Sequence, residues 1–131
     1  MRYDDFLNEA ELKAYVRTLH ARAKQYKLRA GWGVAELRGV ILESGGVCAW
    51  CGVSLLHQPF EVDHIIPLSE RGAHTLDNLA VACPNCNRRK ASLHPARFAQ
   101  EMAVQLGKTT PLIERVLAHF GISATFQKPL L

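Results

Sequence analysis

The sequence predicts an α+β domain in which helices surround a small centre of two strands and one helix. Apolar residues recur at helical spacing before residue 44 and after residue 95. Two short apolar stretches, 60–67 and 79–83, have the length and composition of strands. All four cysteines of the chain lie in two matched pairs, 48–51 and 83–86, which flank the strand region. Together these observations predict the class and place the centre in the middle of the chain.

The composition is that of an ordinary globular protein. The chain has 131 residues, of which 48% are hydrophobic and 21% charged, so we expect one compact domain over residues 1–131. No run approaches the roughly 18 apolar residues of a membrane span. The first residues, MRYDDFLNEAELK, carry acids where a secretion signal needs an apolar stretch. We therefore expect a cytoplasmic protein without a membrane partner.

The first predicted helix is basic. Asn8 is expected to cap it, and apolar residues at helical spacing continue to about Leu28, before Gly31. Between Leu12 and Ala35 the chain contains no acid. The basic residues of this stretch are Lys13, Arg17, Arg22, Lys24, Lys27 and Arg29. A face of this kind suits a polyanion such as nucleic acid, and an ordinary solvated helix face is the alternative.

The later elements are predicted from proline and polar boundaries. In chain order they are a helix over 34–43, a strand over 60–67, a polar loop over 69–78, a strand over 79–83, and helices that begin at Pro84, Pro95 and Pro111. Proline suits the first position of a helix because the missing N–H has no partner within the helix there. The strand–strand–helix order places the helix after Pro84 against the two strands.

The two Cys-x-x-Cys pairs, Cys48–Cys51 and Cys83–Cys86, supply four thiolates, which is a ligand set of tetrahedral Zn²⁺. Zinc is favoured over disulfides because the chain shows no secretion signal. A redox pair is the alternative, but two pairs without a thioredoxin-like pattern disfavour it. Four thiolates close the coordination shell, so the zinc would be structural and would staple a centre too small to hold itself.

The first strand carries two adjacent ionisable residues, Asp63 and His64, in an otherwise apolar run. Their burial needs a compensating partner. If zinc holds Cys86, the adjacent Asn87 is fixed in direction, and a hairpin of the two strands would bring Asp63 and His64 near it. Carboxylate and amide oxygens suit Mg²⁺ or Mn²⁺, and a neutral imidazole can take a proton from a nearby water. A buried ion pair is the alternative.

These elements together resemble the HNH endonuclease family, whose fold is the ββα-metal motif. The resemblance covers roughly residues 37–92 and rests on the stretches CAWCG, EVDHIIPLS, TLDNL and CPNCNRRK. It implies an HNH nuclease core stapled by a four-cysteine zinc site. The flanks would be a basic helical N-terminal extension over 1–36 and C-terminal helices over 93–131.

The resemblance also implies roles for individual residues. Asp63 and Asn87 would bind the catalytic divalent ion, Mg²⁺ or Mn²⁺. His64 would be the general base, and Asn78 would hold the loop that orients it. Because the base must start neutral, activity would fall well below pH of about 6.5, the ordinary imidazole value. Many relatives have two glycines where this chain has Arg71-Gly72-Ala73, so the loop is expected to differ in shape.

Basic residues follow Asn87 on the central helix. Lys90 lies three residues later, on the same helix face, and is predicted together with Arg88 to bind nucleic acid. Arg89, three residues after Cys86, is expected to shield the zinc thiolates. The remaining histidines are interpreted as surface, loop or ordinary helix residues: His20, His57, His74, His94 and His119.

The function implied by the resemblance is hydrolysis of DNA phosphodiester bonds by metal-activated water, with His64 as general base. One alternative is a non-catalytic zinc-stapled module that only binds nucleic acid, and another is a structural interaction domain. Asp63 and His64 disfavour the binding module, because a pure binding knuckle has no use for these residues in a strand. The choice between DNA and RNA stays open, as does a homodimer, which would supply a second site for cutting both strands.

Overall fold

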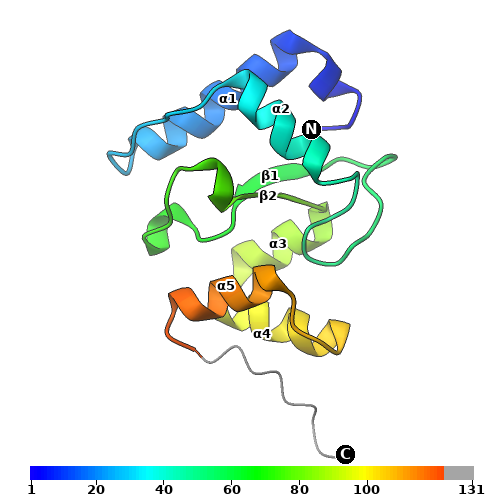
Figure 1. Ribbon diagram of the computed structural model, residues 1–131, viewed down its shortest axis with the longest axis vertical. Helices are drawn as coiled ribbons and strands as arrows, with labels where there is room; N and C mark the ends of the chain where they lie inside the picture. The colour runs from blue at the N-terminus through cyan, green and yellow to red at the C-terminus, as the bar shows by residue number, and fades with distance from the viewer. Residues whose placement is uncertain (123–131) are drawn as a thin grey trace, which may run out of the picture.

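A computed structural model describes residues 1–122, which form five α-helices around a two-stranded antiparallel sheet. The helices are α1 (Glu9–Lys24), α2 (Val34–Glu43), α3 (Pro84–Ser92), α4 (Pro95–Leu106) and α5 (Pro111–His119), and the strands are β1 (Glu61–His64) and β2 (Leu79–Ala82). In Figure 1, α1 and α2 lie at one end, the sheet and α3 in the middle, and α4 and α5 at the other end. The predicted α+β class with flanking helices is confirmed, while residues 123–131 of the C-terminal segment lie outside the described part.

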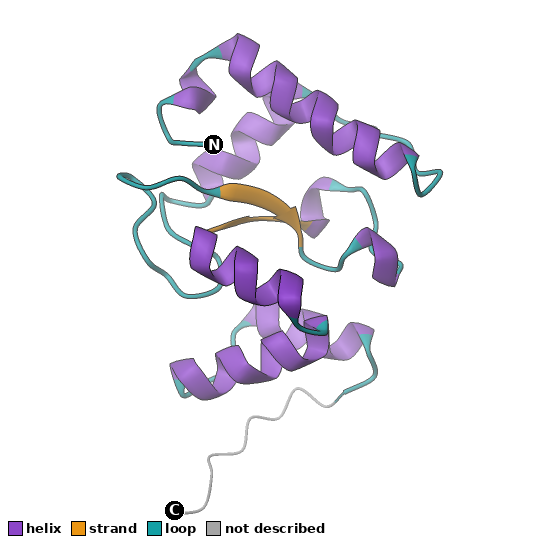
Figure 2. Ribbon diagram, turned by 180° about the vertical axis from the view of Figure 1, so that it is seen from behind, coloured by secondary structure: helices purple, strands orange, loops and turns teal. Residues whose placement is uncertain are grey.

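The sheet is enclosed by helices, as Figure 2 shows from behind. β1 and β2 pair so that Asp63 lies opposite Ala80 and His64 opposite Leu79. All four residues of β2 are buried, whereas exposure alternates along β1. Helix α1 supplies a hydrogen-bond partner for the backbone of β1. The hydroxyl of Tyr15 accepts the N–H of Val62 at 2.9 Å. The centre is therefore held to α1 by a polar contact as well as by apolar packing.

Two elements are shorter than predicted. The first helix begins as expected, with the Asn8 side chain accepting the N–H groups of Ala10 and Glu11, but it ends at Lys24 rather than near Leu28. The backbone turns left-handed at Lys27, with φ at 61°. The first strand ends at His64 rather than at residue 67, because the chain beyond it pairs with a side chain instead of with β2.

The region between the strands is more ordered than a polar loop. It contains two short 3-10 helices, Leu68–Glu70 and Leu76–Asn78. Cys83, predicted to end the second strand, instead caps α3, and its sulfur accepts the N–H of Cys86. None of the helices within residues 1–122 is long and apolar enough to cross a membrane.

Gly72 lies where the inter-strand loop folds back on itself. Its N–H donates to the carbonyl of Pro67 at 2.9 Å. A Cβ atom at this position would lie 1.8 Å from the carbonyl oxygen of Ile66, which is backbone and has no flexible end to move. The close approach of the Ile66 carbonyl therefore requires glycine at position 72 of the Arg71-Gly72-Ala73 segment.

We expect Gly72→Ala to lower the free energy of unfolding by about 3 kcal/mol or more, because the loop backbone must shift to admit the methyl group. The matched control is Gly39→Ala in α2, where a Cβ would meet nothing within 4 Å. That control is expected to be neutral or stabilising by up to about 1 kcal/mol. Urea unfolding of the three proteins measures both, and equal midpoints for Gly72→Ala and wild type would contradict the prediction.

Candidate active site

The four cysteine sulfurs form one cluster. Cys48 and Cys51 come from the knuckle before β1, and Cys83 and Cys86 from the first turn of α3. One ligand atom from each residue lies within 4.8 Å of all the others, and the sulfurs of Cys51 and Cys83 are 3.8 Å apart. A tetrahedron with zinc–sulfur bonds of about 2.3 Å has edges of about 3.8 Å. The cluster therefore fits the predicted zinc ion, which these four residues could hold.

Backbone donors orient the sulfurs before any metal binds. The N–H of Cys83 donates to the sulfur of Cys48, and the N–H of Cys86 donates to that of Cys83, both at 3.3 Å. Burial, followed by the charge of the Cys48 thiolate, raises the pKa of the Cys86 thiol. A bound cation would remove this penalty, since the buried thiolates would then be paired with positive charge.

The predicted shielding of this cluster by Arg89 is wrong. The Arg89 guanidinium reaches α4 instead, where it donates to Gln105 at 2.7 Å and pairs with Glu101 at 3.6 Å. Trp50 lies within the first Cys-x-x-Cys pair, is buried, and packs edge-on against Phe98 of α4 with ring centroids 5.0 Å apart. Aromatic packing from α4, not a basic side chain, covers this part of the knuckle.

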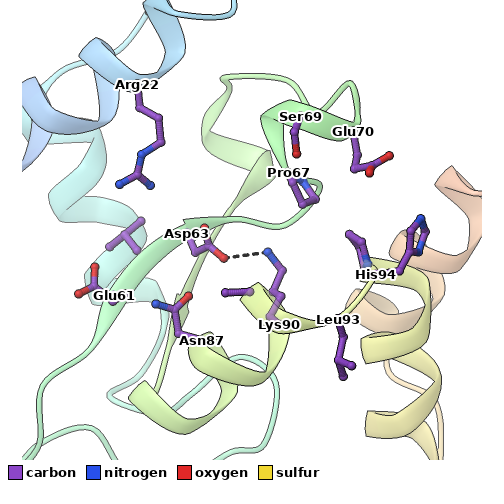
Figure 3. A pocket seen from close by; sticks show the side chains of 13 residues that line it. Arg22, Glu61, Asp63, Pro67, Ser69, Glu70, Asn87, Lys90, Leu93 and His94 are labelled. Atoms are coloured by element: carbon purple, nitrogen blue, oxygen red, sulfur yellow. Dashed lines mark hydrogen bonds and ion pairs between the residues drawn. The ribbon is translucent and has the colours of Figure 1, made fainter.

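A cavity of about 660 Å³ opens beside the sheet. Its lining comes from α1, β1, the loop after β1, α3 and the start of α4, and Figure 3 shows the side chains that face it. Asp63 from β1 and Asn87 from α3, the two predicted metal ligands, both line it. Arg22 of α1 points toward the cavity from the opposite side. The fold thus brings together the two predicted metal ligands and one residue of the basic stretch.

Lys90 is the partner that stabilises Asp63. Its ammonium lies 2.7 Å from the Asp63 carboxylate and donates to the carbonyl of His64 at 2.6 Å. Lys90 is only 7% exposed, so its side chain is buried against β1 rather than extended into solvent. Lys90 therefore supplies a compensating positive charge for the carboxylate in this strand.

His64 points away from the carboxylate side of β1. Neighbouring residues of a strand face opposite sides, and the His64 ring, 3% exposed, contacts His74 of the loop with Nε2 and Nδ1 2.9 Å apart. It does not line the cavity. Burial, with His74 as the second cause, lowers the pKa of His64 to about 4. The ring is consequently neutral at physiological pH.

Asn78 closes the loop that follows β1. Its side-chain oxygen accepts the N–H of Ile66 at 2.9 Å, and its amide donates to the carbonyls of Ile66 at 3.0 Å and Ala73 at 2.7 Å. The residue is 1% exposed, so these contacts satisfy a buried amide completely. This arrangement ends β1 at His64 and fixes the segment that leads to His74.

Three residues near His64 were not among the predicted site residues: His74, His20 and Trp32. His74 lies in the inter-strand loop, in agreement with its interpretation as a surface or loop histidine, but it is buried at 4% exposure rather than on the surface. Its Nε2 lies 2.9 Å from Nδ1 of His20, whose Nε2 lies 3.0 Å from the carbonyl oxygen of Trp32. His20 and His74 are 54 positions apart, and no spacing rule links residues at that distance.

The knuckle, the two strands and α3 form a centre whose four cysteines could hold a zinc ion. Residues 48–93, which contain this centre, match the family described as HNH endonuclease. No solved structure matches the chain.

Three curated proteins are each similar to about half of this chain. The type IV methyl-directed restriction enzyme EcoKMcrA of Escherichia coli is 38% identical over 76 residues, 51% of this chain and 25% of the relative. The CRISPR-associated endonuclease Cas9 of Corynebacterium diphtheriae is 30% identical over 69 residues, and that of Actinomyces naeslundii 31% over 61 residues. The match covers 6% of each Cas9. The similarity therefore concerns one domain of much longer proteins.

We expect the purified protein to carry one zinc ion per chain and to lose its fold when the ion is removed. Removal should lower Tm by about 10 °C or more, because binding of a structural zinc is coupled to folding. Zinc content by mass spectrometry and thermal melts before and after chelation measure this. Added Zn²⁺ should restore the melt and added Mg²⁺ should not, and an unchanged melt in zinc-free protein would contradict the assignment.

The lowered pKa of His64 predicts a specific pH dependence. In zinc-loaded protein without added divalent ion, NMR of the His64 ring should show protonation near pH 4, compared with about 6.5 in the unfolded chain. The unfolded state binds the extra proton between these values, so stability falls by about 3 kcal/mol as pH drops through this window. Titration of the folded-state ring near its ordinary value would contradict the prediction.

Proposed function

We propose that the chain hydrolyses phosphodiester bonds of DNA as an HNH endonuclease. The observation that carries this proposal is that Asp63 and Asn87 face one cavity within the segment that matches the family. The longer relatives, one named as a restriction enzyme and two as CRISPR-associated endonucleases, support it. Because the chain spans only part of those relatives, the activity and its substrate are proposals for this protein.

The proposed roles follow the side chains. Asp63 and Asn87 would hold a divalent ion, Mg²⁺ or Mn²⁺, through a carboxylate and an amide oxygen. When bound there, the ion would stabilise the negative charge that develops on the phosphate and on the departing oxygen. His64 would take the proton of the attacking water at Nδ1, the ring nitrogen that does not contact His74. Asn78 would act indirectly, by holding the loop that carries His74.

Basic residues would bind the phosphate backbone. Arg88 is exposed on α3, and Arg22 points into the cavity. The Lys90 ammonium and a divalent ion on the same Asp63 carboxylate would repel each other, so ion binding would free Lys90 for a phosphate. On this proposal the helices outside residues 48–93 belong to the same domain and take part in DNA binding. A homodimer, which would supply a second site, stays a prediction.

A second function is favoured by one observation. Lys90 pairs with the Asp63 carboxylate at 2.7 Å, and His64 is buried outside the cavity. A paired carboxylate and a histidine outside the cavity also suit a zinc-stapled module that binds nucleic acid without cutting it. The two functions differ in whether an added divalent ion converts bound DNA into cut DNA.

The deciding experiment is plasmid cleavage by wild type and His64→Ala, each with EDTA, Mg²⁺ or Mn²⁺, with zinc content measured in every sample. We expect cutting only with added ion and a loss of about 10²–10⁴-fold in His64→Ala, the usual contribution of a general base. His57→Ala is the matched control, because His57 is exposed in the loop before β1. Its cleavage rate should equal that of wild type.

Three outcomes are informative. Equal cutting by wild type and His64→Ala would reject His64 as the base. Equal cutting in EDTA by protein that keeps its zinc would reject the divalent ion at Asp63 and Asn87. Binding of DNA by both proteins without any cutting would support the binding module and direct the next assays to RNA and single strands.

A further inference from the structure

Three histidines from different parts of the chain form one hydrogen-bonded row, which we call the histidine row: His64 of β1, His74 of the inter-strand loop and His20 of α1. The ring nitrogens of His64 and His74 are 2.9 Å apart, as are those of His74 and His20. The row ends at the carbonyl oxygen of Trp32, 3.0 Å from Nε2 of His20. Two of the three rings are buried and His20 is half-buried.

When all three rings are neutral, the carbonyl at the end of the row sets the direction of every hydrogen bond in it. A carbonyl oxygen only accepts, so Nε2 of His20 must carry the proton. A neutral imidazole has one N–H, so Nδ1 of His20 accepts, and the facing Nε2 of His74 must donate. By the same rule Nδ1 of His74 accepts, and Nε2 of His64 must donate. The lone pair of His64 is thereby left on Nδ1.

Packing holds the row in this order. The indole N–H of Trp32 donates to the carbonyl of His74 at 3.2 Å, so Trp32 is tied to both His20 and His74. Its ring also lies against the rings of His20 and His74, with centroid distances of 4.4 and 5.0 Å. Rotation of one ring would therefore break contacts with its neighbours as well as one hydrogen bond. Burial lowers the pKa of His74 too, which favours neutral rings.

We propose that His74 and His20, anchored on the Trp32 carbonyl, are positioning residues that hold His64 in the tautomer with its proton on Nε2 and its free lone pair on Nδ1. This inference rests on the proposed function, in which Nδ1 receives the proton of the attacking water. Neither His20 nor Trp32 lies in the segment 48–93 that matches the family. The N-terminal helix therefore contributes to the base of this site and is more than a basic arm.

The test uses a pair of variants at His74 and a matched control. His74→Leu removes the acceptor that faces Nε2 of His64, whereas His74→Asn keeps an oxygen that can accept at the position of Nδ1. His57→Leu makes the same chemical change at an exposed histidine outside the row. The tautomer of His64 is read from its ring ¹⁵N shifts in zinc-loaded protein without DNA. Cleavage kinetics give kcat and KM separately.

We expect wild type to show the Nε2–H tautomer. His74→Leu should shift His64 toward the other tautomer and lower kcat about 10–100-fold with KM unchanged, a loss typical of residues that orient a reacting group. His74→Asn should recover most of that loss, and His57→Leu should change neither readout. If His74→Leu does not fold, His20→Leu replaces it, because it releases His74 without touching His64.

The results that overturn the inference are a wild-type His64 with its proton on Nδ1, or ring shifts of His64 that are identical in wild type and in the variant that breaks the row. The tautomer is measured without substrate, so failure of the proposed function looks different. A protein that never cuts DNA, but whose His64 tautomer depends on His74, would reject the nuclease proposal while supporting the row as the group that sets the tautomer.

Discussion

The site depends on the four-cysteine cluster, because this cluster joins the two ends of the segment that carries the site. Cys48 and Cys51 precede β1, while Cys83 and Cys86 begin α3, where the Cys83 sulfur also caps the helix. Holding the sulfurs together fixes the first turn of α3 and hence the direction in which Asn87 leaves it. The register of β1 with β2 then places Asp63 beside the same helix.

A second constraint is the alternation of a strand, which sends Asp63 and His64 to different surroundings. Asp63 contacts the ammonium of Lys90 at the cavity, 2.7 Å away. His64 enters a buried region in which desolvation lowers its pKa and favours the neutral imidazole. Two adjacent residues thus lie in different electrostatic surroundings. The loop between the strands also contacts α5, where Nε2 of His119 lies 2.7 Å from the carbonyl oxygen of Glu70.

Helix starts were predictable because their signals are local. Asn8 and the prolines at 84, 95 and 111 stand at the observed N-termini, since capping and the missing proline N–H act within one turn. The ends were less predictable. The strand after His64 stops because Asn78, distant in sequence, takes both backbone groups of Ile66. The fold class was predictable from hydrophobic periodicity, and the cysteine cluster from the two Cys-x-x-Cys pairs. The functional roles of Asp63, His64, Asn78 and Asn87 remain predictions.

The sequence by itself determined the chemistry that is present: four thiolates in two pairs, and a carboxylate, an imidazole and an amide in a strand–strand–helix frame. Only the tertiary structure decided which charges and protons face one another. It paired Lys90 with Asp63, and it lined up His20 and His74 behind His64. The physical reason is that spacing records contacts within a turn or a hairpin. Residues 54 positions apart become neighbours only through tertiary packing. The same packing removes water from ionisable groups, and this desolvation shifts their pKa values.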